Sequence, residues 1–163
     1  MTPAGGAGSA IAGIESLPFA VAMRQWLWLY PSVEIMHIIG FVTLVGSIAM
    51  FDLRVLGFGR QLPVKALARH LLPWSAGSML LVLPTGLLLF VADPLALLAK
   101  RLFLLKLALI AAAGLNALAF HAGPYRRAEA WAQRAPSRAI LHALLSLGLW
   151  IAVIACGRLL AYF

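Results

Sequence analysis

Charged residues are scarce in this chain of 163 residues: only 11% are charged, whereas 63% are hydrophobic. Soluble domains carry about a quarter of charged residues and are about half apolar. A fold surrounded by water could not cover this much apolar surface with so few charges. The composition therefore excludes an ordinary soluble domain and predicts that lipid is the solvent for much of the chain.

Other scarcities narrow the range of functions. Cys156 is the only cysteine, so an internal disulfide is impossible, and its apolar surroundings favour a packing role. The five acidic residues form no row across the apolar runs, which argues against a proton or cation pump in one subunit. The sequence also lacks a Walker loop and the Gly-x-Ser-x-Gly, Cys-x-x-Cys and His-Glu-x-x-His motifs. No soluble stretch is long enough for a catalytic domain.

What the chain does have is four long apolar runs. A bilayer core about 30 Å thick needs about 20 helical residues, and barrel strands would be shorter and alternate in polarity. We predict an all-α integral membrane four-helix bundle over residues 16–163. The Gly/Ala-rich residues 1–15 are expected to be disordered, and they lack the pattern of a signal peptide. The predicted spans are about 31–51, 69–92, 102–121 and 139–163.

The segment before the first run differs in character. Residues 16–30 are apolar but contain a proline and an arginine, and they end in Trp26, Trp28 and Tyr30. Such aromatic residues favour the headgroup layer of a bilayer. We predict an N-terminal interfacial helix that turns at Pro31 into the first span. A fifth, shorter span is the alternative.

Basic residues predict the orientation. The net charge of +8 sits in short loops between apolar runs, which favours a role in membrane orientation over nucleic-acid binding. One side of the predicted bundle is richer in lysine and arginine and should face the cytoplasm. Both termini are then expected in the periplasm of a bacterial cell with the protein in its inner membrane. The basic residues of the richer side are Arg54, Arg60, Lys65, Arg69, Arg126, Arg127, Arg134 and Arg138.

Polar residues at membrane depth are costly, so each is a candidate functional residue. Asn116 should form a hydrogen bond across helices, and Lys106 is expected to extend to the headgroups. Asp52 and Arg54 close the first run and are expected to form a salt bridge or a cap, with a pairing of Asp52 to a histidine as the alternative. The whole set is Glu34, His37, Asp52, His70, Lys106, Asn116, His121 and His142.

Three of the four histidines fall at one predicted depth. His70 opens the second span, His121 closes the third and His142 begins the fourth. In a sequential bundle the second and fourth spans are diagonal, so His70 and His142 could ligate a b-type haem from two sides, with His121 replacing one of them or binding a propionate. The alternative is that these imidazoles simply lie in the interfacial layer.

A second pattern is Glu34-x-x-His37 in the first span. Spacing of three places both side chains on one helix face, where they could bind copper or zinc or relay protons. Two ligands are too few for a tight metal site, so others would have to join them. Methionines offer soft sulfur ligands for copper, although they usually serve packing. The alternative is a Glu–His hydrogen bond that holds the start of the helix.

Several stretches together resemble uncharacterised bacterial inner-membrane proteins that are classed as a domain of unknown function. The resemblance covers about residues 25 to 163 and implies four membrane helices, but no activity. In layout the chain is also remotely similar to cytochrome b561-like haem proteins and to copper-resistance D-type membrane proteins. The stretches that carry the resemblance are Trp28–His37, Gly40, Gly46, Asp52–Arg54, Leu72–Trp74, Thr85–Phe90, Asn116–His121 and Gly157-Arg158.

From the sequence we therefore expect a small inner-membrane, b-type haem-binding subunit of electron transfer. Its partners would be quinone or other membrane subunits, in a homo- or hetero-oligomer, and not nucleic acid. A copper-handling or transport protein that uses Glu34 and His37 is one alternative. A cofactor-free membrane scaffold or assembly subunit is another.

Overall fold

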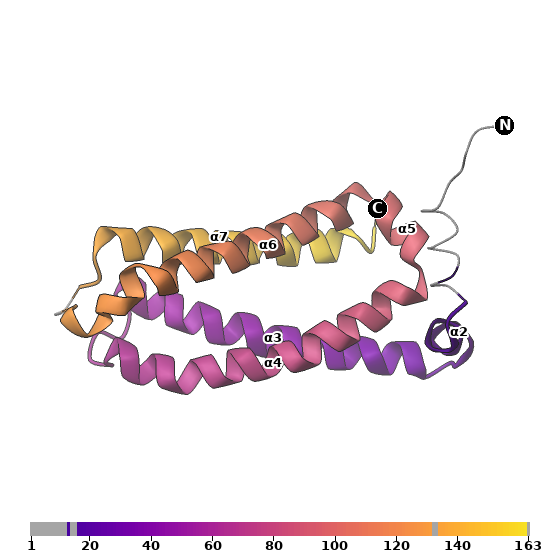
Figure 1. The fold of residues 1–163 in the computed structure, drawn as a ribbon, viewed down its shortest axis with the longest axis horizontal. Helices are drawn as coiled ribbons and strands as arrows, with labels where there is room; N and C mark the ends of the chain where they lie inside the picture. Colours follow the sequence, from indigo (N-terminus) through magenta and orange to yellow (C-terminus); the bar gives the residue numbers. More distant parts are fainter. Residues whose placement is uncertain (1–12, 14–15, 132–133, 163) are drawn as a thin grey trace.

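The computed structural model describes residues 13, 16–131 and 134–162, and every regular element in this part of the chain is a helix (Figure 1). The all-α prediction is confirmed. The expected disorder of residues 1–15 concerns a stretch that, Gly13 apart, lies outside the described residues. The helices are α2 (Pro18–Gln25), α3 (Leu29–Leu56), α4 (Val64–Ala92), α5 (Pro94–Ala99), α6 (Arg101–Ala122), the 3₁₀ helix η1 (Pro124–Ala130) and α7 (Ser137–Leu159).

Four of these helices are long and apolar enough to cross a membrane: α3, α4, α6 and α7. At 1.5 Å per residue, even the shortest, α6, is about 33 Å long, which exceeds the hydrocarbon thickness of about 30 Å. The α2 end of the bundle holds α2, α5 and the C-terminus, and the η1 end holds η1 and the α3–α4 loop (Figure 1).

The distribution of polar side chains is the reverse of that in a soluble protein. Large apolar residues cover the outside; Leu80, for example, is 79% exposed. Buried positions include small or polar residues on each of the four long helices. This arrangement suits a bundle in lipid, where helices pack through small residues and polar groups turn inward. The buried polar or charged residues are Ser47, Asp52, Arg54, Ser78, Thr85, Asn116 and Ser146.

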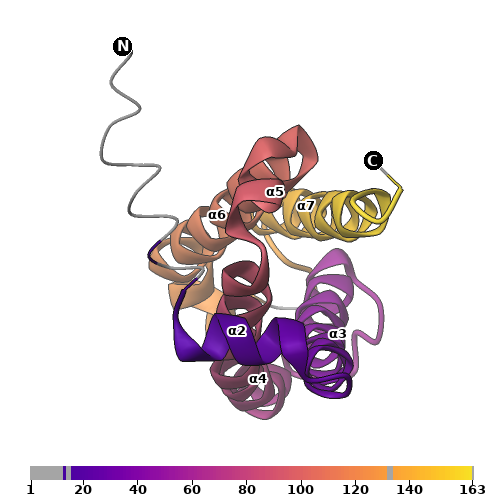
Figure 2. The ribbon, with the colours of Figure 1, turned by 90° about the vertical axis from the view of Figure 1, so that its right-hand side faces the viewer.

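The long helices form two antiparallel hairpins, α3–α4 and α6–α7. The hairpins are joined where α3 packs on α7, as the end-on view shows (Figure 2). Within the described residues, the backbone of α4 does not approach α6 or α7 closely, nor does that of α3 approach α6. Rings still bridge these helices, as in Phe51–Phe120 and Phe90–Phe103. The closest backbone approach between the long helices of the two hairpins is therefore the α3–α7 seam.

The turn into α3 lies earlier than predicted. The chain turns at Trp26–Trp28 and α3 begins at Leu29, so Pro31 sits inside the first helical turn. The first amide groups of a helix have no helical acceptor, so a proline there loses no hydrogen bond. Before this turn, α2 crosses the end of the bundle, and Arg24 Nη1 donates to the Ala92 carbonyl oxygen at 3.1 Å.

The end of α3 extends beyond the predicted residue 51. It stops at Gly57, whose φ of 109° suits a residue without a Cβ. Arg54 allows this extension because its guanidinium turns back onto the loop. Its Nε donates to the Leu62 carbonyl at 2.6 Å and its Nη2 to the Arg60 carbonyl at 3.0 Å. The described residues contain no ion pair between Asp52 and Arg54, so of the expected salt bridge or cap the salt bridge is wrong, whereas Arg54 makes cap-like bonds at the end of α3.

Candidate functional site

His37 lies inside the bundle, in the half nearer the α2 end. It is eight residues into α3, and its Nδ1 is 3.0 Å from Thr85 Oγ1 on α4. The imidazole packs over Gly86, where an added Cβ would lie only 3.0 Å from His37 Cε1. The small residue at 86 therefore provides the space in which the ring sits against α4.

The proton on His37 can be placed from its neighbours. Thr85 Oγ1 lies 2.5 Å from the Leu81 carbonyl oxygen, and its single hydrogen is donated there. The same oxygen must then accept the hydrogen bond from His37 Nδ1. In the neutral ring this leaves the lone pair on Nε2. His37 is thus held as a base whose available nitrogen is Nε2.

Lys106 also turns into the bundle, in the half nearer the α2 end. It is half-buried on α6, and its Nζ is 3.6 Å from the position that a Cβ on Gly157 of α7 would occupy. It is also within electrostatic range of His37 and Cys156. The small residue at 157, two residues before the end of α7, opens a place for its ammonium, and the extension of Lys106 to the headgroups stays a prediction.

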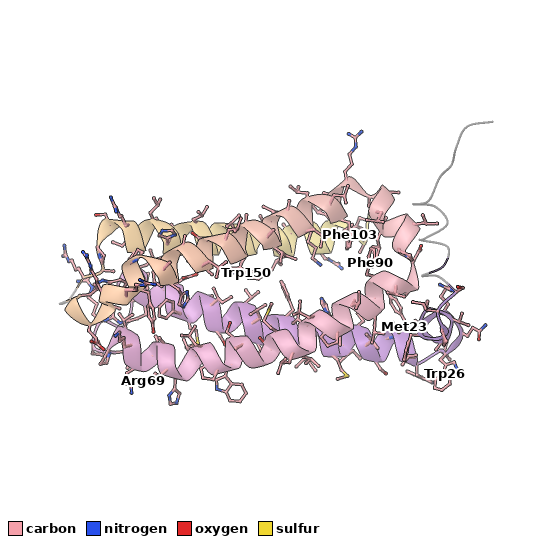
Figure 3. All side chains as sticks on the ribbon, viewed as in Figure 1. Met23, Trp26, Arg69, Phe90, Phe103 and Trp150 are labelled. Atoms are coloured by element: carbon pink, nitrogen blue, oxygen red, sulfur yellow. The ribbon has the colours of Figure 1, made fainter. Side chains whose placement is uncertain are left out.

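Aromatic pairs lie in the same half of the bundle. Phe90 of α4 and Phe103 of α6 stack with centroids 5.9 Å apart and an interplanar angle of 7°, so large rings bridge two helices whose backbones do not approach closely (Figure 3). One turn from His37 toward the η1 end, Phe41 meets Trp150 of α7 edge-on at 6.0 Å. The basic groups therefore lie in a section of the bundle that is rich in flat aromatic surface.

Glu34 does not join His37 inside. It is exposed, whereas His37 is half-buried. Among the described residues, no three His, Cys, Asp or Glu side chains are grouped so that they could hold a metal ion. Glu34 stays within electrostatic range of His37, but no third ligand among the described residues completes the predicted copper site.

The second polar group lies near the η1 end, between α6 and α7. The Asn116 side chain donates from Nδ2 to the His142 carbonyl at 3.0 Å, and its Oδ1 accepts from His142 Nδ1 at 2.7 Å. The first bond fixes the orientation of the amide and so requires the proton of His142 to be on Nδ1. The predicted hydrogen bond of Asn116 across helices is confirmed, with His142 as its partner.

The three histidines predicted at one depth have different environments. His121 Nδ1 bonds to the Ala117 carbonyl of its own helix at 2.8 Å. Both His121 and His142 contact the ring of Phe120, with centroids 5.6 and 6.1 Å away. His70 is exposed on α4, a helix whose backbone does not approach α7 closely. The structure brings His121 and His142 to one aromatic ring but does not bring His70 to them.

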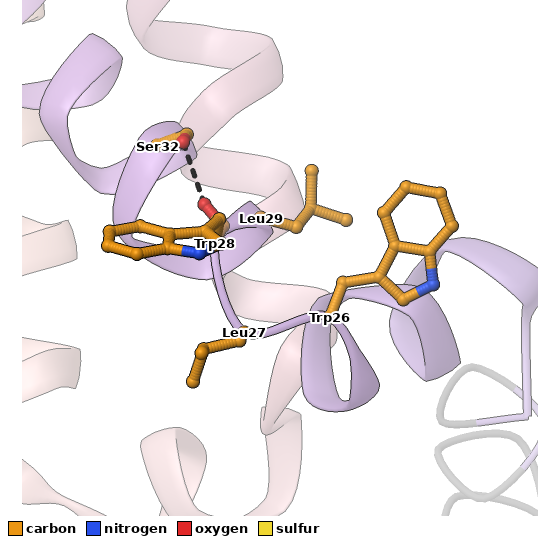
Figure 4. Close-up of a pocket in the computed structure, with 5 residues that line it drawn as sticks. All are labelled: Trp26, Leu27, Trp28, Leu29 and Ser32. Atoms are coloured by element: carbon orange, nitrogen blue, oxygen red, sulfur yellow. Dashed lines mark hydrogen bonds between the residues drawn. The ribbon is translucent and has the colours of Figure 1, made fainter.

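An apolar hollow marks the corner between α2 and α3 (Figure 4). Trp26, Leu27 and Trp28 line it and are largely exposed, with Trp28 at 76%. Ser32 Oγ donates to the Trp28 carbonyl at 2.7 Å and steadies the turn. Exposed tryptophans beside the end of a spanning helix are typical of the headgroup layer. Trp26 and Trp28 are therefore interpreted as interfacial anchors and not as the lining of a ligand site.

No protein-family model, curated protein or solved structure matches this chain. The fold defines the class of the protein as a multi-pass membrane protein. Within that class, the functional argument depends on the geometry of its own residues.

Proposed function

We propose that this protein is a small membrane subunit of electron transfer that binds a quinone or quinol in the α2-end half of its bundle. The observation that carries the proposal is that Lys106, half-buried on α6, lies within electrostatic range of half-buried His37 on α3, in an otherwise largely apolar part of the bundle. His37 offers a nitrogen lone pair, and Lys106 offers hydrogen-bond donors with a positive charge.

These two groups complement what a quinone carrier presents. A quinol hydroxyl can donate to His37 Nε2, and a quinone carbonyl or a quinolate oxygen can accept from Lys106. Glu34 is within electrostatic range of His37 but is exposed, and within the described residues Lys106 forms no ion pair. An acceptor ligand would therefore satisfy a cation that is costly to leave unpaired in an apolar medium. The aromatic residues Phe41, Phe90, Phe103 and Trp150 supply flat apolar surface for a ring.

The haem hypothesis stays a prediction with a different ligand choice. His121 and His142 both have Nδ1 committed to an acceptor, which leaves Nε2 in the form that binds iron. Exposed His70 has no comparable setting. An absorption spectrum of protein expressed with ample haem tests this: a Soret band lost in His142→Ala but kept in His70→Ala supports the revised ligand, and a colourless protein excludes haem.

Binding in lipid nanodiscs tests the quinone proposal. Short-chain ubiquinone and menaquinone analogues, oxidised and reduced, would be titrated against wild type, His37→Leu and Lys106→Met. Losing a hydrogen bond to a charged or buried group costs about 1.5 to 3 kcal/mol, so each variant should bind about 10 to 100 times more weakly. His70→Leu is the matched control and should bind like wild type. Equal affinity in all four proteins, or none in folded wild type, would refute the site.

We also propose that the η1 end faces the cytoplasm of a bacterial cell. The basic loop residues support this orientation, since the richer side of a multi-pass protein is retained there. A C-terminal alkaline phosphatase fusion should then be active, whereas a C-terminal green fluorescent protein fusion should be dark. The opposite pair of results would reverse the orientation.

A further inference from the structure

Asp52 is a buried acid whose surroundings do not match a carboxylate. It lies near the η1 end of α3 with only 6% of its surface exposed, and its Oδ2 has no hydrogen-bond partner. Its polar neighbour is Ser146 of α7, which is also buried. The acid therefore sits at the α3–α7 seam, the contact that joins the two hairpins.

The basic residues nearest to Asp52, in sequence or on the neighbouring helices, either bond to other groups or are exposed. Arg54 is committed to the Arg60 and Leu62 carbonyls of the loop. On α4, Lys65 pairs with Glu129 of η1 at 2.6 Å, and Arg69 and His70 are exposed. On α7, Arg138 is exposed and His142 is bonded to Asn116. Within the described residues, Lys65–Glu129 is the only ion pair, so no cation neutralises Asp52.

We propose that Asp52 is a proton-binding site inside the bilayer and carries its proton at neutral pH. An isolated carboxylate in an apolar interior is far more costly than the neutral acid, and it neutralises itself by binding a proton. When Asp52 carries its proton, its O–H can donate a hydrogen bond to the hydroxyl oxygen of Ser146, so the site needs no neighbouring cation. The inference does not depend on the quinone proposal, since it uses a different end of the bundle.

Proton binding at this position controls the α3–α7 seam. When the proton leaves, a negative charge is created between the two helices that hold the hairpins together. Between the titration midpoints of the unfolded and the folded chain, only the folded state binds the proton. The folded-to-unfolded ratio should therefore fall tenfold for each unit of rising pH in that window, and it should level off above it.

Infrared spectroscopy tests the proposal directly. Folded wild type near pH 7 should show the C=O stretch of a protonated carboxyl, with a downshift in D₂O, and Asp52→Asn should remove the band. Glu129→Gln, which changes an exposed carboxyl, should leave it in place. Absence of the band in wild type, its persistence in Asp52→Asn, or its loss on adding Na⁺ or K⁺ at constant pH would overturn the proposal.

Unfolding in mixed micelles gives a second measurement. Relative to Asp52→Asn, wild type should lose stability as the pH rises through the window, and Asp52→Asn should itself fold because the amide keeps the size of the acid and carries no charge. A constant difference between the two proteins from pH 5 to pH 9 would also overturn the proposal.

Discussion

The hydrogen bonds between Asn116 and His142 should make a measurable contribution to the packing of α6 on α7. Asn116→Leu removes both bonds and leaves the Nδ1 hydrogen of His142 without an acceptor. A hydrogen bond between membrane helices is worth about 0.6 kcal/mol on average and about 1.7 at most. A stranded buried donor costs about 1 to 3 kcal/mol. We therefore expect Asn116→Leu to lower the free energy of unfolding by about 2 to 4 kcal/mol.

A double-mutant cycle isolates the side-chain bond, which is the shorter of the two at 2.7 Å. His142→Phe keeps a ring against Phe120 and keeps the backbone carbonyl that accepts from Asn116. The variant that combines Asn116→Leu with His142→Phe should lose about 1 to 2 kcal/mol less unfolding free energy than the two single variants lose together. In each single variant one buried polar group is left without its partner, whereas in the double variant both groups are gone. Reversible unfolding in mixed micelles, followed by circular dichroism, measures these terms.

The matched control combines Asn116→Leu with His70→Phe. His70 is exposed on a helix whose backbone does not approach α6 or α7 closely, so the two effects should add. If Asn116→Leu and His142→Phe are also additive within about 0.3 kcal/mol, the bond does not stabilise the fold and the argument is refuted.

Two further predictions concern the η1 end. Gly57→Ala should destabilise the protein by about 1 kcal/mol in the same unfolding assay, because φ is 109° there, and an unchanged midpoint would argue against that backbone conformation. The hydrogen bond and charge of Lys65 lower the pKa of Glu129, so its contribution is present above the usual titration range of glutamate and disappears as the pH falls through the lowered pKa. The stability difference between wild type and Glu129→Gln should shrink toward acid pH and high salt, and a difference that grows in acid would contradict the pair.

Much of the fold was predictable because length and apolarity alone determine which segments can cross a bilayer. The four long helices follow from that criterion. The exact ends did not follow, because they depend on local chemistry. Arg54 lets α3 continue past Asp52 by reaching the loop carbonyls, and Pro31 is accepted within the first turn because no acceptor is lost there.

The candidate sites were less predictable because a helix that is apolar all round has no pattern that marks its inner face. His37 and Lys106 are recognisable as polar residues at depth, but their meeting depends on the small residues Gly86 and Gly157 of two other helices. His70 was grouped with His142 by depth and by the expected diagonal placement of their helices, neither of which determines the rotation about the α4 axis that leaves His70 exposed. The isolation of Asp52 depends on Arg54 turning away, which sequence spacing does not reveal.

The α3–α7 seam has a mechanical consequence. The contact between α3 and α7 forms a line about which the two hairpins could rotate. On the opposite side, the stacked rings of Phe90 and Phe103 hold α4 to α6. Separating α4 from α6 about this line would break the Phe90–Phe103 stack, while the contact of α4 with η1, which includes the Lys65–Glu129 ion pair, would hold the opposite end together. A lipid-soluble ligand could then enter laterally from the bilayer, between α4 and α6, without passing through water.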